Sequence, residues 1–143
     1  MFQQTLLMIK PEGIDLIDEI VDSIKNDGLQ ISEGHSIICS EEFLRCLYKE
    51  QSGMFWEVNK EYLVGKHCVL FIVYGDDAVS RLLALSGKHY SPENCDRYTI
   101  RYRFGKRETY IGKNGISLYL NAVHRSSPEN AEYEVALFNK WFR

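Results

Sequence analysis

The sequence lacks the features that would assign it to a membrane or secreted class. It has 143 residues, and none of its apolar runs approaches the ~20 residues that a membrane-spanning helix needs. We therefore expect no membrane partner. The N-terminus, M-F-Q-Q-T-L-L-M-I-K, lacks the charged region, apolar core and cleavage site of a signal peptide. No repeat, low-complexity tract or linker interrupts the chain, which predicts one domain over residues 1–143.

The sequence also lacks an excess of positive charge and any paired cysteine motif. Its net charge of -3 creates no overall field that attracts nucleic acid, so an anionic ligand must be held by a local cluster of donors. The four cysteines are widely spaced, at positions 39, 46, 68 and 95. This spacing argues against a metal site or a disulfide framework and favours reduced thiols. Together with the missing signal peptide, it predicts a cytoplasmic protein.

Short apolar runs predict the strands of a sheet. Residues 5–10 and 67–74 read T-L-L-M-I-K and H-C-V-L-F-I-V-Y, which is typical of buried central strands. Residues 29–38 alternate between apolar and polar and predict a third strand. An Asn-Gly pair between β-forming residues predicts a hairpin near 108–120. Its second arm is expected to run into His124.

Helical spacing of apolar residues predicts the helices. The first covers residues 15–26, with Asp15 as a possible cap and Gly28 as its stop. The others are expected to begin near Ser40, near Asp76 and at Pro128. Residues 86–106 are rich in turn formers and basic side chains and predict a long loop. This alternation of strands and helices favours an α/β sandwich, an antiparallel sheet covered by helices.

His124 is the first residue that can carry chemistry. A neutral imidazole is abundant at pH 7 and can attack an electrophile when a second group fixes its tautomer. Glu134, in the helix that follows, can be that group, and Ser126 can donate a hydroxyl hydrogen bond. Each of these residues alone is more often structural. Lys10, at the end of the first strand, is a point charge suited to a phosphate or simply marks the strand boundary.

Two further segments suggest a phosphorylated ligand. Residues 97–107 read R-Y-T-I-R-Y-R-F-G-K-R, with four arginines and a lysine. Basic residues interleaved with aromatics can bind nucleic acid, but in an acidic chain a small polyphosphate is the better interpretation. The aromatic residues of the 43–63 segment can either stack on a base or pack in the core.

In combination these residues resemble the nucleoside diphosphate kinase family over nearly the whole chain. L-M-I-K-P-E-G is similar to its opening strand, N-A-V-H-R-S to its N-x-x-H-x-S motif and A-E-Y-E to the start of its following helix. L-Y-K-E, G-M-F-W and Y-T-I-R resemble its tyrosine, aromatic and arginine segments. The matching site residues are Lys10, Tyr48, Phe55, Arg101, Asn121, His124, Ser126 and Glu134.

The resemblance implies a ferredoxin-like α/β sandwich, whose four-stranded antiparallel sheet is covered by helices, with the hairpin near 108–120 as an extra element. It implies a ping-pong transfer of the γ-phosphate of a nucleoside triphosphate to a nucleoside diphosphate. His124, Lys10, Tyr48 and Glu134 would be catalytic. The nucleotide would contact Lys10, Phe55, Arg101, Asn121, Ser126 and Tyr90. Mg²⁺ would be bound through the nucleotide phosphates, with no metal ligand from the protein, in a homo-oligomer.

The sequence departs from the family pattern at several positions. Leu83 stands where the family has a helix arginine, and the family threonine before the next proline becomes Tyr90 or His89. Both positions contact phosphates in the family. Arg81, Lys88 or His89 are candidates to compensate. The segment between Arg101 and Asn121 is longer than the family pattern, and the aspartate that follows H-x-S is absent.

These departures leave alternatives to an active enzyme. The chain can be a catalytically weak or inactive nucleotide-binding or scaffold module on the same fold, as the loss of the helix arginine suggests. It can also bind nucleic acid through the basic residues 97–107. The retention of the other site residues favours a divergent nucleoside diphosphate kinase.

Overall fold

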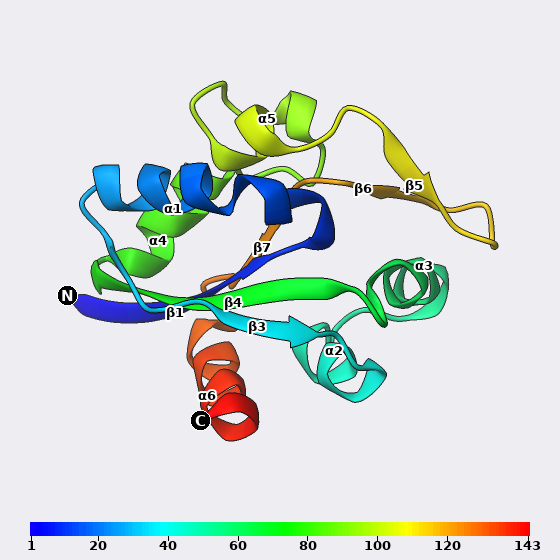
Figure 1. Ribbon diagram of the computed structural model, residues 1–143, viewed down its shortest axis with the longest axis horizontal. Helices are drawn as coiled ribbons and strands as arrows, with labels where there is room; N and C mark the ends of the chain where they lie inside the picture. The colour runs from blue at the N-terminus through cyan, green and yellow to red at the C-terminus, as the bar shows by residue number, and fades with distance from the viewer.

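The computed structural model describes residues 1–143, which fold around one antiparallel sheet (Figure 1). Strand β4 (His67–Asp76) lies between β1 (Phe2–Ile9) and the edge formed by the short strands β2 (Gln30–Ile31) and β3 (His35–Ile38). Strand β7 (Val123–Arg125) pairs with the other side of β1. Because β2 and β3 share one edge, the sheet has the four strand positions of the predicted ferredoxin-like sandwich, which is confirmed.

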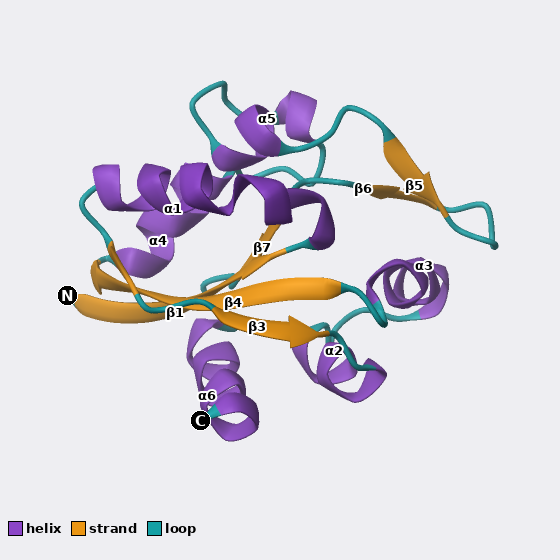
Figure 2. Ribbon diagram, viewed as in Figure 1, coloured by secondary structure: helices purple, strands orange, loops and turns teal.

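Helices cover both faces of this sheet (Figure 2). On one face lie α1 (Ile17–Asn26), α4 (Ala78–Ser86) and α5 (Ile100–Phe104). On the other lie α2 (Glu41–Leu47), α3 (Gly53–Leu63) and α6 (Ala131–Phe142). The period of two in a strand sends alternate residues to opposite faces, so Leu6 and Met8 belong to the second core and Leu7 and Ile9 to the first. No helix of the chain has the length and apolar character required to traverse a lipid bilayer.

Two predicted helix starts are wrong, and the loop over 86–106 is not structureless. Pro11–Leu16 form a 3₁₀ turn, η1, so Asp15 caps nothing and α1 begins at Ile17. The last helix begins at Ala131, after a turn that contains Pro128. Residues 86–106 contain the turn η2 (Pro92–Asn94) and helix α5. A helix this short has too few turns for a periodic sequence pattern.

The helix predicted to begin near Ser40 is α2, and Ser40 is its N-cap, whose hydroxyl accepts a hydrogen bond from the Phe43 amide at 3.2 Å. The predicted strand over 29–38 is interrupted instead, because the Ser32 hydroxyl accepts the Ile72 amide in place of a continuous ladder.

The predicted hairpin forms from β5 (Thr109–Ile111) and β6 (Ser117–Tyr119) as a separate two-stranded sheet. Its second arm does not run into His124. The backbone adopts a left-handed conformation at Ala122, with φ of 73°, which breaks the strand. The chain then enters the main sheet as β7, with His124 opposite Met8.

Candidate active site

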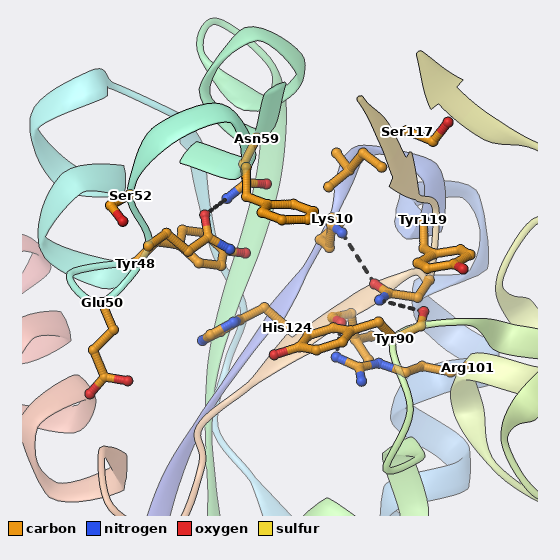
Figure 3. Close-up of a pocket in the computed structure, with 15 residues that line it drawn as sticks. Lys10, Tyr48, Glu50, Ser52, Asn59, Tyr90, Arg101, Ser117, Tyr119 and His124 are labelled. Carbon is orange, nitrogen blue, oxygen red and sulfur yellow. Dashed lines mark hydrogen bonds between the residues drawn. The ribbon is translucent and has the colours of Figure 1, made fainter. Parts of the chain in front are cut away.

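A cavity of about 530 Å³ opens at the edge of the sheet beside β7 (Figure 3). Its walls come from the end of β1, the segment from Tyr48 into α3, the loop before α5, the hairpin strand β6, and β7. A smaller cavity of about 330 Å³ shares His124, Tyr48 and Arg101 with it. The larger cavity brings together seven residues predicted from the sequence: Lys10, Tyr48, Phe55, Tyr90, Arg101, Asn121 and His124.

The His124 ring is fixed from one side. Its Nε2 lies 2.9 Å from Oε1 of Glu134 on α6, and its side chain is 16% exposed. The Tyr48 ring packs edge-on against the imidazole at 5.0 Å between centroids. Because the carboxylate accepts a hydrogen bond from Nε2–H, the neutral ring keeps its proton on Nε2 and carries its lone pair on Nδ1. Nδ1 makes no hydrogen bond within the chain, so this nitrogen is free to act as a nucleophile.

Ser126 lies behind this pair and lines neither cavity. Its hydroxyl donates to Oε1 of Glu134 at 2.8 Å and accepts the Leu6 amide at 3.2 Å. The side chain is buried, so the structure does not bring Ser126 to the cavities that the other predicted residues line. It holds the carboxylate that holds His124.

Lys10 directly follows the last residue of β1 and is a buried cation. Its Nζ donates to Oδ1 of Asn121 at 3.1 Å and lies 3.6 Å from Oε2 of Glu12. Burial lowers the pKa of Lys10, and the neighbouring Glu12 opposes this shift. Sequence reasoning missed Glu12, whose carboxylate also accepts the Ala122 amide at 3.1 Å and the Tyr62 hydroxyl at 2.9 Å. The position of Glu12 in the K-P-E-G motif, two residues after Lys10, is the sequence signal that could have identified it.

Arg101 is buried in α5 with no carboxylate in ion-pair distance. Its guanidinium donates to the carbonyls of His89 and Val123, both at 3.1 Å, and its Nε has no partner. Burial lowers the pKa of Arg101 to about 10, so the side chain is still charged at neutral pH. A buried cation that only carbonyls satisfy is suited to an anionic ligand.

The remaining predicted residues surround the mouth of the site. Burial raises the pKa of Tyr48, so its phenol stays protonated and can donate. Phe55, on α3, is 64% exposed and presents a face to the larger cavity. Tyr90 is also exposed, and its carbonyl accepts Nδ2 of Asn121 at 3.0 Å. Figure 3 shows Tyr90 beside Arg101 and His124.

The structure distinguishes among the residues proposed to compensate for Leu83. Arg81 donates to the carbonyls of Asp27 and Asp76 and lines neither cavity. Lys88 and His89 are exposed and line neither cavity, whereas Tyr90 lines both.

The hairpin forms one wall of the larger cavity and is fastened to α3. The Tyr110 hydroxyl and the Lys113 amide donate to Glu61 at 2.5 and 3.1 Å. The Asn114 side chain donates to the Met54 carbonyl at 3.0 Å. Leu118, on the second hairpin strand, lines the cavity that Phe55 also lines. The hairpin therefore adds a wall that these contacts hold against α3.

At Gly13, the turn η1 lies in close contact with Ala122, the residue that precedes β7. A Cβ at this position would lie 2.8 Å from the Ala122 carbonyl oxygen, which also accepts the Lys10 amide. We expect Gly13→Ala to destabilise the fold by about 1–3 kcal/mol and to displace Lys10 from Asn121. Thermal unfolding and turnover measure the two effects. An unchanged midpoint with unchanged turnover contradicts the prediction.

A metal ion here would need ligands beyond the protein. No group of three or more His, Cys, Asp or Glu side chains converges in the structure. Mg²⁺ prefers oxygen ligands and keeps several waters, so phosphate oxygens and water suit it in this cavity. Glu50 lines both cavities.

Comparisons with known proteins agree with this arrangement. The family model described as nucleoside diphosphate kinase matches residues 3–142. A nucleoside diphosphate kinase of Saccharolobus islandicus is 31% identical over 140 residues, covering 95% of this chain and 94% of the relative. One from Campylobacter hominis is 31% identical over 142 residues, with the same coverage.

Solved structures show the same fold. The enzyme from Borrelia burgdorferi with bound vanadate and ADP superposes with a TM-score of 0.84 at 24% identity, covering 99% of this chain and 88% of that one. The apo enzyme from Encephalitozoon cuniculi gives 0.78 at 30% identity, covering 98% and 88%. This chain therefore belongs to the nucleoside diphosphate kinase family, a family of phosphotransferases that act on nucleotides.

Proposed function

We propose that the chain transfers the γ-phosphate of a nucleoside triphosphate to a nucleoside diphosphate through a phosphorylated His124. Phosphate transfer between nucleotides is the activity of the family. The observation that carries the ping-pong route is the His124–Glu134 contact of 2.9 Å, which leaves Nδ1 without a partner beside a cavity lined by buried cations. The nucleotides bound by relatives, ADP and CDP, support the substrate class.

In the proposed first half-reaction, the Nδ1 lone pair attacks the γ-phosphorus and the bond from phosphorus to the β,γ-bridging oxygen breaks. The nucleoside diphosphate leaves with that electron pair. The Nε2 proton stays on the ring, and Glu134 stabilises the positive charge that the imidazole acquires. Lys10 and Arg101 balance the negative charge spread over the phosphoryl oxygens in a loose transition state.

In the second half-reaction, a terminal phosphate oxygen of another nucleoside diphosphate attacks the phosphorus. The phosphorus–nitrogen bond breaks, and its electron pair returns to Nδ1. The exposed ring of Phe55 offers a stacking surface to the base, which every base can use because every base has a π-face. The Asn121 amide and the Tyr48 hydroxyl line the same cavity and can donate hydrogen bonds to the phosphates or the sugar.

Mg²⁺ bound to the nucleotide phosphates would supply charge neutralisation. We propose one domain over residues 1–143, because both apolar cores are built on the same sheet. A homo-oligomer and a cytoplasmic location are also proposed, the latter supported by four free cysteines.

A labelling experiment tests the reaction directly. After incubation with ATP that carries a radioactive γ-phosphate, we expect an acid-labile, base-stable label on the protein that chases into GDP. A chain that binds nucleotide but acquires no label is a scaffold module instead. Binding to nucleic acid with a steep salt dependence, and no label, favours the third hypothesis.

A further inference from the structure

Arg125 has no role in the reaction described above. It follows His124 on β7 and pairs with Leu7, whereas His124 pairs with Met8, so the two side chains leave the strand on opposite faces. Because β7 lies at the edge of the sheet, the side chains of His124 and Arg125 can still reach the same cavity. Arg125 lines the smaller cavity together with His124 and Arg101.

The Arg125 guanidinium is anchored at the end of α4. Its Nε donates to the Ser86 hydroxyl at 3.2 Å, and its Nη2 donates to the Gly87 carbonyl at 3.1 Å. The third nitrogen, Nη1, makes no hydrogen bond within the chain, and no carboxylate lies within ion-pair distance of this arginine. The side chain is therefore held in place while part of its donor capacity stays unused.

The Arg101 guanidinium lies beside it. Its Nη1 is 3.4 Å from the Gly87 carbonyl oxygen that Arg125 also contacts, and its Nε is buried without a partner. Burial and the neighbouring Arg125 lower the pKa of Arg101. Two uncompensated guanidiniums so close together repel each other, and an anion that contacts both removes this cost.

The anchor of Arg125 coincides with the position at which the chain departs from its family. Leu83 occupies the place of the helix arginine, one turn before the anchor, and its carbonyl accepts both the Ser86 hydroxyl and the Gly87 amide. A guanidinium fixed on Ser86 and Gly87 thus lies at the same end of α4 from which the missing side chain would have started.

We propose that Arg125 binds the phosphates of the nucleotide beside Arg101 and takes the place of the arginine that is absent at Leu83. This inference rests on the proposed function for the identity of the ligand. Arg125 supplies a fork of donors from β7 where relatives with the full motif supply it from α4. Nothing in this role requires contact between Arg125 and the base.

Equilibrium binding of ADP and of adenosine to the full chain tests the role. We expect Arg125→Gln to raise the Kd for ADP about tenfold to a hundredfold, as for the loss of charged hydrogen bonds, and to leave the Kd for adenosine unchanged. Arg125→Lys, which keeps the charge but not the fork, should give an intermediate loss. Arg97→Gln removes an exposed charge from the basic segment 97–107, outside both cavities, and should change neither constant.

The double variant Arg125→Gln with Leu83→Arg tests the replacement, because an arginine on α4 should restore much of the ADP affinity. An unchanged ADP affinity in Arg125→Gln overturns the proposal, as does an equal loss for ADP and adenosine, which indicates a structural effect. A double variant with no recovery overturns the replacement of the helix arginine. A wild-type chain that binds ADP without transferring phosphate contradicts the proposed function but not this binding role.

Discussion

Replacement of His124 by alanine is expected to abolish phosphate transfer between nucleotides, with a loss of at least about 10⁴-fold in turnover. The imidazole lines the cavity together with the buried cations Lys10 and Arg101, and the Glu134 carboxylate orients it. Without Nδ1 the transferred group has no acceptor on the protein, and direct transfer would require both nucleotides in one site. A coupled assay of ATP formation from ADP and GTP measures the loss, and the radioactive phosphoenzyme should disappear with it.

Two controls separate this loss from damage to the fold. Thermal unfolding and ADP binding of the His124→Ala variant should stay close to wild type, because the His124 side chain faces the cavity. His67→Ala removes an exposed histidine at the start of β4, outside both cavities, and should keep full turnover. Phosphoenzyme that persists in His124→Ala would place the nucleophile elsewhere.

The second large effect is expected at Glu134. Its carboxylate accepts hydrogen bonds from His124 at 2.9 Å and from Ser126 at 2.8 Å, and the side chain is 3% exposed. Glu134→Gln keeps the shape but removes the charge that stabilises the positive ring, and its amide can favour the other tautomer. By analogy with orienting carboxylates of triads, we expect turnover to fall by about 10²–10⁴-fold. Single-turnover labelling rates measure this step.

The kinetic pattern distinguishes orientation from binding. Glu134 lies behind the histidine, so Glu134→Gln should lower kcat and leave the Kd for ADP near its wild-type value. Glu132→Gln, an exposed carboxylate on the same helix, is the matched control and should have no effect. Ser126→Ala should cost less, about tenfold, because only one hydrogen bond to Glu134 is lost. Equal activity of Glu134→Gln and wild type would exclude the proposed orientation.

The strands at 67–74 and 5–10 were predictable because a strand that is buried on both faces requires a continuous apolar run. The start of a helix near Ser40 was predictable because its signals, a capping hydroxyl and acidic residues in the first turn, are local in the sequence. The first and last helices begin later than predicted, since Pro11 and Pro128 introduce turns whose length depends on the packing around them. The assignments of Lys10 and His124 came from motif chemistry, which depends only on residue types and spacing.

By itself the sequence determined which side chains were present, the alternation of strands and helices, and the family that these resemble. Only the tertiary structure decided which groups meet: Ser126 behind Glu134, Glu12 under Lys10, and Arg125 beside Arg101 on the Gly87 carbonyl. The physical reason is that hydrogen bonds and charge pairs act over a few ångströms. Residues separated by tens of positions reach such distances only when the sheet and its helices have packed.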